Sequence, residues 1–223
     1  MEGRSPGVNS SPIIKVCGLC RADDVDQALD AGANALGFVH HPPSVRHLDL
    51  QLLAQHVQRT RERSDARTVL VLVDVAPDRA LDWAVQAGVS HLQLCGREDP
   101  LDWVGLRAAP RLWRRVAVQS GASEELEAWG ELCEAFVLDH PEGPGGTGIP
   151  VDTSLARDLA SRAPCILAGG LDGESVGAQV AAVDPMGVDA SSRLEREPGI
   201  KDSAAVSAFE KAARQALAAG GAA

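Results

Sequence analysis

The sequence predicts an α/β protein folded as a single-domain (β/α)8 barrel, the TIM barrel. The length of 223 residues fits one such domain. Eight short apolar runs alternate with helix-like stretches, as in repeated strand–helix units. The runs are almost continuously apolar, which is typical of parallel strands buried on both faces. No linker or shift of composition divides the chain, so we expect one domain.

An internal repeat supports this alternation. Residues 28–38 resemble residues 84–94, and each segment has the pattern of a helix end, a glycine and a buried strand. Asp49 and Ser123 are predicted to cap the helices that follow them. The predicted strands are Ile13–Cys17, Ala35–Val39, Thr68–Asp74, His91–Cys95, Leu112–Val118, Ala135–Asp139, Cys165–Ala168 and Gly187–Ala190.

We expect the barrel to span residues 12–218. Residues 1–11 are polar and rich in Gly, Ser and Pro, which predicts a flexible N-terminal arm, and residues 219–223 predict a frayed tail. No segment has the pattern of a signal peptide or a membrane span, so a cytoplasmic location is expected. The odd number of cysteines, 5, agrees with a reducing compartment.

Composition excludes two classes of partner. The formal net charge of −10 argues against a broad surface for nucleic acid or anionic membrane. Aromatic residues make up only 3% and Tyr is absent, which argues against a stacking platform for single strands. The net charge is still compatible with a small anionic substrate, because backbone N–H groups and an arginine within a site can outweigh the negative field of more distant residues.

Two small-residue turns predict a phosphate site. Residues 167–171 (LAGGL) and 189–195 (DASSRLE) each follow a predicted strand and lead into a helical stretch. Such turns expose backbone N–H groups at a helix start, where they bind a phosphate dianion. In a (β/α)8 barrel this site is typically made by the loops after strands 7 and 8, which is where both turns fall.

The first candidate for chemistry is Cys17, at the end of the first strand. A thiol there, close to a helix N-terminus, can have a lowered pKa and act as a base or nucleophile. The alternative is a small buried apolar residue. Cys17 and Cys20 also form a C-x-x-C pair, but no second pair exists, so we expect no metal and no redox cofactor.

Asp139 is the second candidate, at the end of the sixth strand. It is either a general acid/base or the cap of a turn, and the glycine-rich segment 143–148 behind it could fold over a ligand. Arg46 follows a rigid Pro-Pro turn and either binds a substrate carboxylate or is a surface residue. Asp74 is predicted to cap the helix that starts near Pro77.

These residues lie in motifs through which the chain resembles the phosphoribosylanthranilate isomerase family over nearly its whole length. Nine short stretches match in the same order: Lys15–Gly18, Ala31–Phe38, Pro43–Arg46, Gln93–Gly96, Leu138–Asp139, Gly145–Gly148, Leu167–Leu171, Gly187–Ser192 and Pro198–Asp202.

The resemblance implies an Amadori rearrangement of N-(5-phosphoribosyl)anthranilate to the 1-deoxyribulose 5-phosphate derivative in tryptophan biosynthesis. It implies that Asp139 is the acid that protonates the ring oxygen and Cys17 the base that removes the C2 proton. It implies no cofactor. Arg46 would lie near the anthranilate carboxylate. Substrate binding would also involve Gly146 and the phosphate-binding residues Gly169, Gly170, Ser191 and Ser192.

The chain departs from the family pattern at four positions. It has Cys20 for Thr, Cys95 for His, Ile149 for Lys and, after the paired serines, Arg193 for Gly. Arg193 could swing outward, clamp the phosphate or plug the site. We therefore keep two alternatives open, a divergent paralogue acting on another N-glycoside and a non-catalytic barrel scaffold. The resemblance leaves open whether the protein is a monomer or a homodimer.

Overall fold

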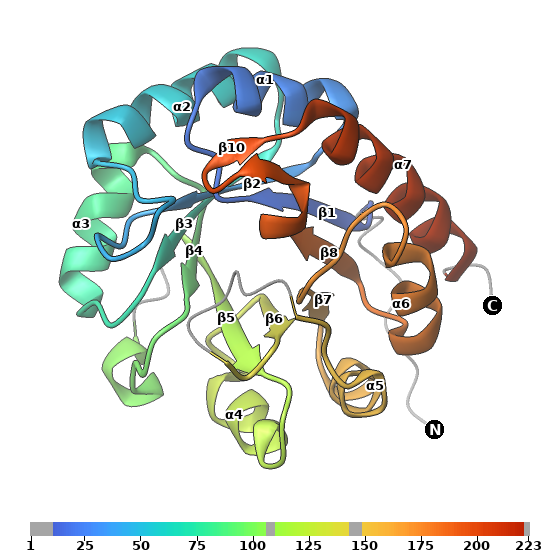
Figure 1. Ribbon diagram of the computed structural model, residues 1–223. Helices are drawn as coiled ribbons and strands as arrows, with labels where there is room; N and C mark the ends of the chain where they lie inside the picture. The colour runs from blue at the N-terminus through green and yellow to red at the C-terminus, as the bar shows by residue number, and fades with distance from the viewer. Residues whose placement is uncertain (1–10, 106–109, 143–148, 221–223) are drawn as a thin grey trace.

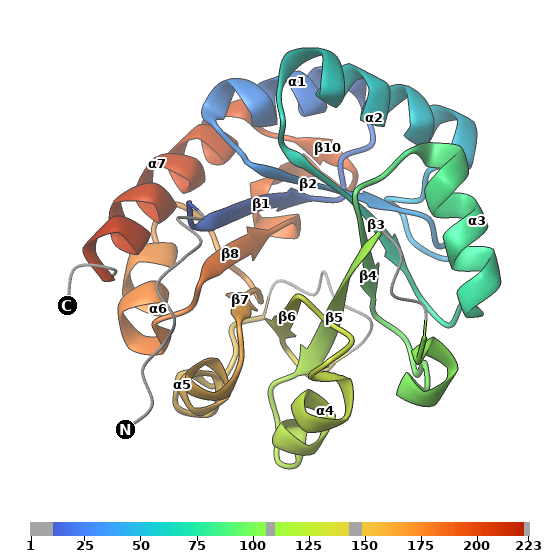
Figure 2. The same ribbon diagram turned by 180° about the vertical axis from the view of Figure 1, so that it is seen from behind.

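The fold is a closed barrel of eight parallel strands in the order of the sequence, with β8 pairing back onto β1. The computed structural model describes residues 11–105, 110–142 and 149–220. The helices surround the strands (Figures 1 and 2). The strands are β1 (Ile13–Cys17), β2 (Ala35–Val39), β3 (Arg67–Leu72), β4 (His91–Leu94), β5 (Arg111–Ala117), β6 (Ala135–Asp139), β7 (Cys165–Leu167) and β8 (Gly187–Ala190).

The connections after the strands carry the helices and one small additional sheet. In this sheet β9 pairs antiparallel with β10 beyond the end of β8. These elements are α1 (Ala22–Ala31), α2 (Leu50–Arg63), α3 (Pro77–Ala87), the 3-10 helix η1 (Pro100–Trp103), α4 (Ala122–Trp129), α5 (Thr153–Arg162), α6 (Val176–Val183), the 3-10 helix η2 (Ser192–Leu194), β9 (Glu195–Glu197), β10 (Ile200–Lys201) and α7 (Ser203–Gly220).

All eight predicted strands are confirmed, four of them (β1, β2, β6 and β8) with the predicted bounds. The apolar runs predict the strands correctly because alternate residues of each strand face the helices and the barrel interior. Both faces are therefore buried, and most of the strand is apolar. The interior cluster is small: Ile13, Cys17, Ala35, Val69, Val71, Cys95, Trp113, Ala135, Val137, Ile166 and Ala168.

The predicted repeat is also confirmed, since α1 and α3 both end at a glycine in the left-handed conformation. Gly32 has φ 103° and Gly88 has φ 71°, and each N–H returns to the carbonyls of its helix. Asp49 caps α2 as predicted, its side chain accepting a hydrogen bond of 2.8 Å from the N–H of Leu52. These ends fix where each following strand enters the barrel.

Two predicted caps are wrong. Helix α4 starts from Gly121, which has φ 87°, so Ser123 is already helical. The cap of α3 is Ala76, with Pro77 as the first helical residue. Asp74 instead has φ 54° and accepts a hydrogen bond of 2.7 Å from the N–H of Arg97. The turn after β3 is too long for the Asp74 side chain to serve α3.

Residues 1–10 of the predicted arm and 221–223 of the predicted tail lie outside the described residues, and α7 continues to Gly220. Within the described ranges, no helix is both long and apolar enough to span a membrane.

One carboxyl group in this fold is buried without a hydrogen-bond partner among the described residues. Glu210, on α7, is 1% exposed, and both carboxyl oxygens lack a hydrogen bond. The nearest cation is the Arg214 guanidinium, 3.6 Å away. Burial raises the pKa of Glu210 to about 8, against the weaker attraction of Arg214.

We predict that Glu210 makes stability fall as the pH rises from about 5 to about 8. Over this interval the folded protein keeps a proton that the unfolded chain has released, so the free energy of unfolding falls by up to about 1.4 kcal/mol per pH unit. The Glu210→Gln variant should lose this slope and melt at a higher temperature than wild type at pH 8. Urea unfolding between pH 5 and 8.5 measures the slope. The exposed Glu127→Gln substitution is the control, and an unchanged slope in Glu210→Gln would contradict the assignment.

Candidate active site

A cavity opens at the carboxyl ends of the barrel strands. This end is where the fold gathers functional residues from separate strands. The cavity is lined by every predicted site residue that the structure describes: Cys17, Arg46, Asp139, Gly169, Gly170, Ser191, Ser192 and Arg193. Gly146, the remaining predicted residue, lies outside the described residues.

Cys17 lies at the last position of β1, facing the barrel interior. It packs against β2 at Gly37, where a Cβ atom would come within 2.6 Å of its sulfur. Burial raises the pKa of the Cys17 thiol, although the positive charges of Lys15 and Lys201 act in the opposite direction. The lowered pKa that a thiol at a strand end can have is therefore not found for Cys17, because enclosure in the barrel outweighs the nearby cations.

Below Cys17, a buried ion pair joins the first and last strands. The Lys15 Nζ atom lies 2.6 Å from Asp189 Oδ2, and Lys15 is fully buried. Burial lowers the pKa of Lys15, but the attraction of Asp189 and Cys17 outweighs it, so the ammonium stays charged. This pair was not predicted from the sequence. It could have been, because residues two apart in a strand lie on the same face, and Lys15 and Asp189 each lie two residues before a residue that lines the cavity.

Asp139 ends β6 and is 7% exposed. Its Oδ1 accepts a hydrogen bond of 2.8 Å from the N–H of His140, and Arg115 Nε lies 3.9 Å from its Oδ2. The Asp139 side chain thus lies in the cavity beside Arg115, a cation on β5. It makes the contact expected of a turn cap with one oxygen, while the residue also lines the cavity.

The turn after β7 has the backbone that two adjacent glycines allow. Gly169 has φ 88° and Gly170 has φ 65°, conformations that strain residues with a side chain. A Cβ atom at Gly169 would also approach the carbonyl oxygen of Ile149 to 2.9 Å. Among the described residues, no hydrogen-bond acceptor is found for the backbone N–H groups of Gly169 and Gly170. The backbone form of this turn is one that suits an anion.

The turn after β8 leads into the short helix η2 rather than a long one. Ser191 donates its hydroxyl to the carbonyl oxygen of Cys17 at 3.0 Å, which ties the ends of β8 and β1 together. Arg193 is exposed and lines the same cavity. Burial raises the pKa of Asp172 in the neighbouring turn, but hydrogen bonds from Ser175 and Glu174 and the charge of Arg193 together lower it.

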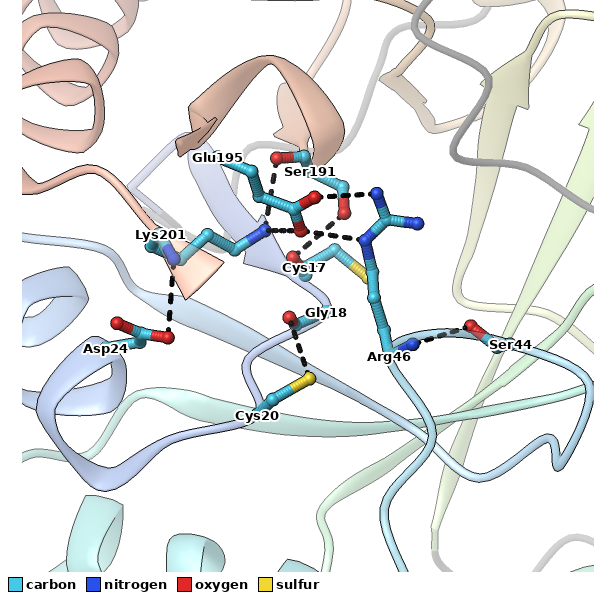
Figure 3. Close-up of polar contacts among 9 residues, drawn as sticks. All are labelled: Cys17, Gly18, Cys20, Asp24, Ser44, Arg46, Ser191, Glu195 and Lys201. Atoms are coloured by element: carbon cyan, nitrogen blue, oxygen red, sulfur yellow. Dashed lines mark hydrogen bonds and ion pairs between the residues drawn. The ribbon is translucent and has the colours of Figure 1, made fainter. Parts of the chain in front are cut away.

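Arg46 does not stand alone at the cavity, as Figure 3 shows. Its Nε and Nη2 atoms donate hydrogen bonds of 2.7 Å each to the two carboxylate oxygens of Glu195. Lys201 Nζ donates to the same carboxylate at 2.9 Å. Neither Glu195 nor Lys201 was identified as a site residue from the sequence. The link between Arg46 and Glu195 spans 149 residues of chain, and no local pattern indicates it.

The other positions that depart from the family pattern differ in their distance from the cavity. Cys95 lines it, receives a hydrogen bond of 3.4 Å from Gln93 Nε2, and has its pKa raised to about 12 by burial. The Cys20 thiol lies 3.6 Å from the carbonyl oxygen of Gly18. In the described part of the chain, no three His, Cys, Asp or Glu residues form a cluster that could hold a metal ion.

Comparison with known proteins gives one consistent result. The family model described as N-(5'-phosphoribosyl)anthranilate isomerase matches residues 14–212. Proteins of that name from Chelativorans sp. and Dechloromonas aromatica are 37% and 38% identical, each aligning over 91% of this chain and 96% of the relative.

Solved structures agree. The phosphoribosyl anthranilate isomerase of Thermotoga maritima is 27% identical with a TM-score of 0.81, covering 92% of this chain and 99% of that one. A phosphoribosyl anthranilate isomerase solved with reduced 1-(o-carboxyphenylamino)-1-deoxyribulose 5-phosphate is 26% identical with a TM-score of 0.79, over the same shares. The chain belongs to the N-(5'-phosphoribosyl)anthranilate isomerase family and is an isomerase of tryptophan biosynthesis.

Proposed function

We propose that Cys17 and Asp139 are the base and the acid of this isomerisation, acting on N-(5-phosphoribosyl)anthranilate in the cavity. The observation that carries the proposal is their placement. A thiol from β1 and a carboxylate from β6, strands that do not neighbour each other, line one cavity together with two phosphate-type turns. An acid and a base around one sugar are what an aldose–ketose conversion needs.

The reaction divides between the two groups. Asp139 donates a proton to the furanose ring oxygen, the C1–O bond breaks and the nitrogen lone pair forms an iminium. The Cys17 thiolate then removes the C2 proton, and the electron pair of that C–H bond forms an enolamine. The enolamine tautomerises to the ketone, so atoms and charge balance without any other reactant. The cations Lys15 and Lys201 favour the thiolate that the second step requires.

We assign the phosphate and the carboxylate of the substrate to two different groups of residues that line the cavity. The backbone N–H groups of Gly169 and Gly170, with those at Ser191 and Ser192, would hold the phosphate, and Arg193 would add a charged clamp from the rim. Arg46 would face the anthranilate carboxylate. The exposed position of Arg193 supports the clamp over a plug. A changed substrate is the second candidate, which the Arg193 substitution alone favours.

Replacing either proposed catalytic residue should abolish turnover and leave the fold intact. Cys17→Ser loses the thiolate and Asp139→Asn loses the proton donor, so each should lower kcat by at least about 1,000-fold. Chromatographic separation of substrate and product measures turnover, and circular dichroism checks the fold. Normal kcat in a folded variant would refute the role given to that residue.

The Cys17 thiol should become more reactive toward alkylation with rising pH. Because burial holds the pKa of Cys17 above its usual value, the thiolate fraction grows about tenfold per pH unit below that pKa. The rate of alkylation by iodoacetamide between pH 7 and 9, followed by mass spectrometry of the Cys17 peptide, measures this slope. The Cys133→Ala variant, altered away from the cavity, should keep it. A rate of alkylation at Cys17 that does not change over this range would show that the thiol is already ionised.

Arg193 can be tested against its family counterpart. If the guanidinium clamps the phosphate, Arg193→Gly should raise KM about 10- to 150-fold, as loss of one charged hydrogen bond implies, with a smaller change in kcat. Inhibition by inorganic phosphate should weaken in parallel. A lower KM in Arg193→Gly would instead identify the side chain as an obstruction and favour the changed substrate.

A further inference from the structure

The feature that the proposed chemistry leaves unexplained is the set of charges behind Arg46, which we call the Arg46 network: Arg46, Glu195 and Lys201. The Glu195 carboxylate is its centre, receiving two hydrogen bonds from Arg46 and one from Lys201. The side chains are 15%, 4% and 0% exposed, respectively. Figure 3 shows them meeting beside Cys17.

Three separate parts of the fold hold the network in place. Glu195 and Lys201 are cross-strand partners in the β9–β10 pair, so their side chains meet directly. Lys201 Nζ also donates to the carbonyl oxygen of Ser191 at 3.1 Å, next to the phosphate-type turn. On the other side, Arg46 passes over Gly18, where any Cβ atom would overlap its Cδ. The guanidinium is therefore enclosed between the β1 end and the hairpin.

Glu195 determines which part of the guanidinium faces the cavity. The bidentate pair uses Nε and Nη2 and fixes the plane of the group. In Figure 3 the remaining nitrogen of Arg46 points away from Glu195. Arg46 itself lines the cavity. One edge of the fork is thus held by the protein, and the other is presented to a ligand in a set orientation.

The network also has an uneven charge. Burial raises the pKa of Glu195, but the hydrogen bonds and charges of Arg46 and Lys201 outweigh it, so the carboxylate is ionised. Burial lowers the pKa of Lys201 against the attraction of Glu195, while its Nζ atom donates to both the Glu195 carboxylate and the carbonyl oxygen of Ser191. With Lys201 protonated, two cations against one anion leave one surplus positive charge among the groups that bond to Glu195. Asp24, the next acid, contacts the backbone N–H of Lys201 at 3.4 Å rather than its ammonium. One carboxylate in the cavity would balance the surplus.

We propose that Glu195 and Lys201 are positioning residues that make the site selective for a substrate with a carboxylate on its aromatic amine. Glu195 orients the free edge of Arg46, and Lys201 supplies the surplus charge that the carboxylate neutralises. The proposal rests on the role given to Arg46 above. It goes beyond that role by assigning selectivity to two residues that do not touch the substrate.

The test compares two substrates that differ by one group, the phosphoribosyl adducts of anthranilate and of aniline. Glu195→Gln keeps the shape and removes the charge. The variant gains positive charge but loses the bidentate pair that orients Arg46, and we expect the lost orientation to dominate: KM for the anthranilate adduct should rise about tenfold, equal to about 1.4 kcal/mol, with kcat changed less than about threefold. A lower KM would show that charge rather than orientation sets the affinity, and it would overturn the role of Glu195. The aniline adduct should be turned over as by wild type. The control is Glu197→Gln, an exposed glutamate on the same strand, which should change neither substrate.

A purely structural role predicts a different result. If the network only supports the hairpin, Glu195→Gln would harm both substrates equally, and that outcome overturns the proposal. In an Arg46→Met background, Glu195→Gln should have no further effect on KM, because it acts through Arg46. If the increases in KM caused by Arg46→Met and Glu195→Gln instead multiplied in the double variant, the two residues would act independently, and this result would also overturn the proposal. Should Glu195→Gln fail to fold, Lys201→Met is compared in the same way and should lose the preference for the carboxylate.

Calorimetry separates this proposal from the proposed function. Binding of the reaction product and of its decarboxylated analogue is measured without turnover, so the carboxylate preference can be found or lost even in a protein that does not catalyse the reaction. Inactive wild type with a carboxylate preference that Glu195→Gln removes would refute the proposed function alone. Active wild type with no preference between the two ligands would refute the positioning role alone.

Discussion

Closure of the barrel between β8 and β1 is the constraint on which the site depends. The two strands pair in parallel with Lys15 opposite Asp189, and their side chains form a buried ion pair of 2.6 Å. Burying either charge alone would cost several kcal/mol, so each requires the other. This closure brings Cys17 beside the Ser191 turn, although 174 residues of chain separate them.

A second principle follows from the first, namely that charged side chains around the cavity occur in small groups of opposite sign. Lys15 pairs with Asp189, Arg46 and Lys201 share Glu195, and Arg115 lies near Asp139. Such pairing lets ionised side chains remain where water is largely excluded. It also keeps their positions fixed before a ligand arrives, which is how a site reduces the reorganisation that a reaction would otherwise require.

Much of this could be predicted from the sequence, for reasons that are local. The strands are recognisable because burial on both faces requires continuous apolar runs, and Cys17 and Asp139 are recognisable because each ends such a run. The turn at Gly169–Gly170 is recognisable because its positive φ angles favour glycine, so the residue type indicates the backbone conformation. The remainder depends on distant contacts. The spacing of Glu195 and Arg46 in the sequence does not indicate that they form an ion pair. Asp74 does not cap α3, because the turn that precedes the helix is too long. The pKa of Cys17 is raised by burial that only the folded barrel creates.

The Arg46 network also has a place in the order of synthesis. Arg46 is made early, in the loop after β2, whereas Glu195 and Lys201 belong to a hairpin that follows the eighth strand. A nascent chain can thus form several strand–helix units while the guanidinium still lacks its partner. The edge of Arg46 that we propose for the carboxylate acquires its orientation only when the β9–β10 hairpin has emerged and the barrel has closed. On this proposal, the ability to recognise the substrate is acquired only after the eighth strand has been made, although the recognising residue lies in the loop after the second.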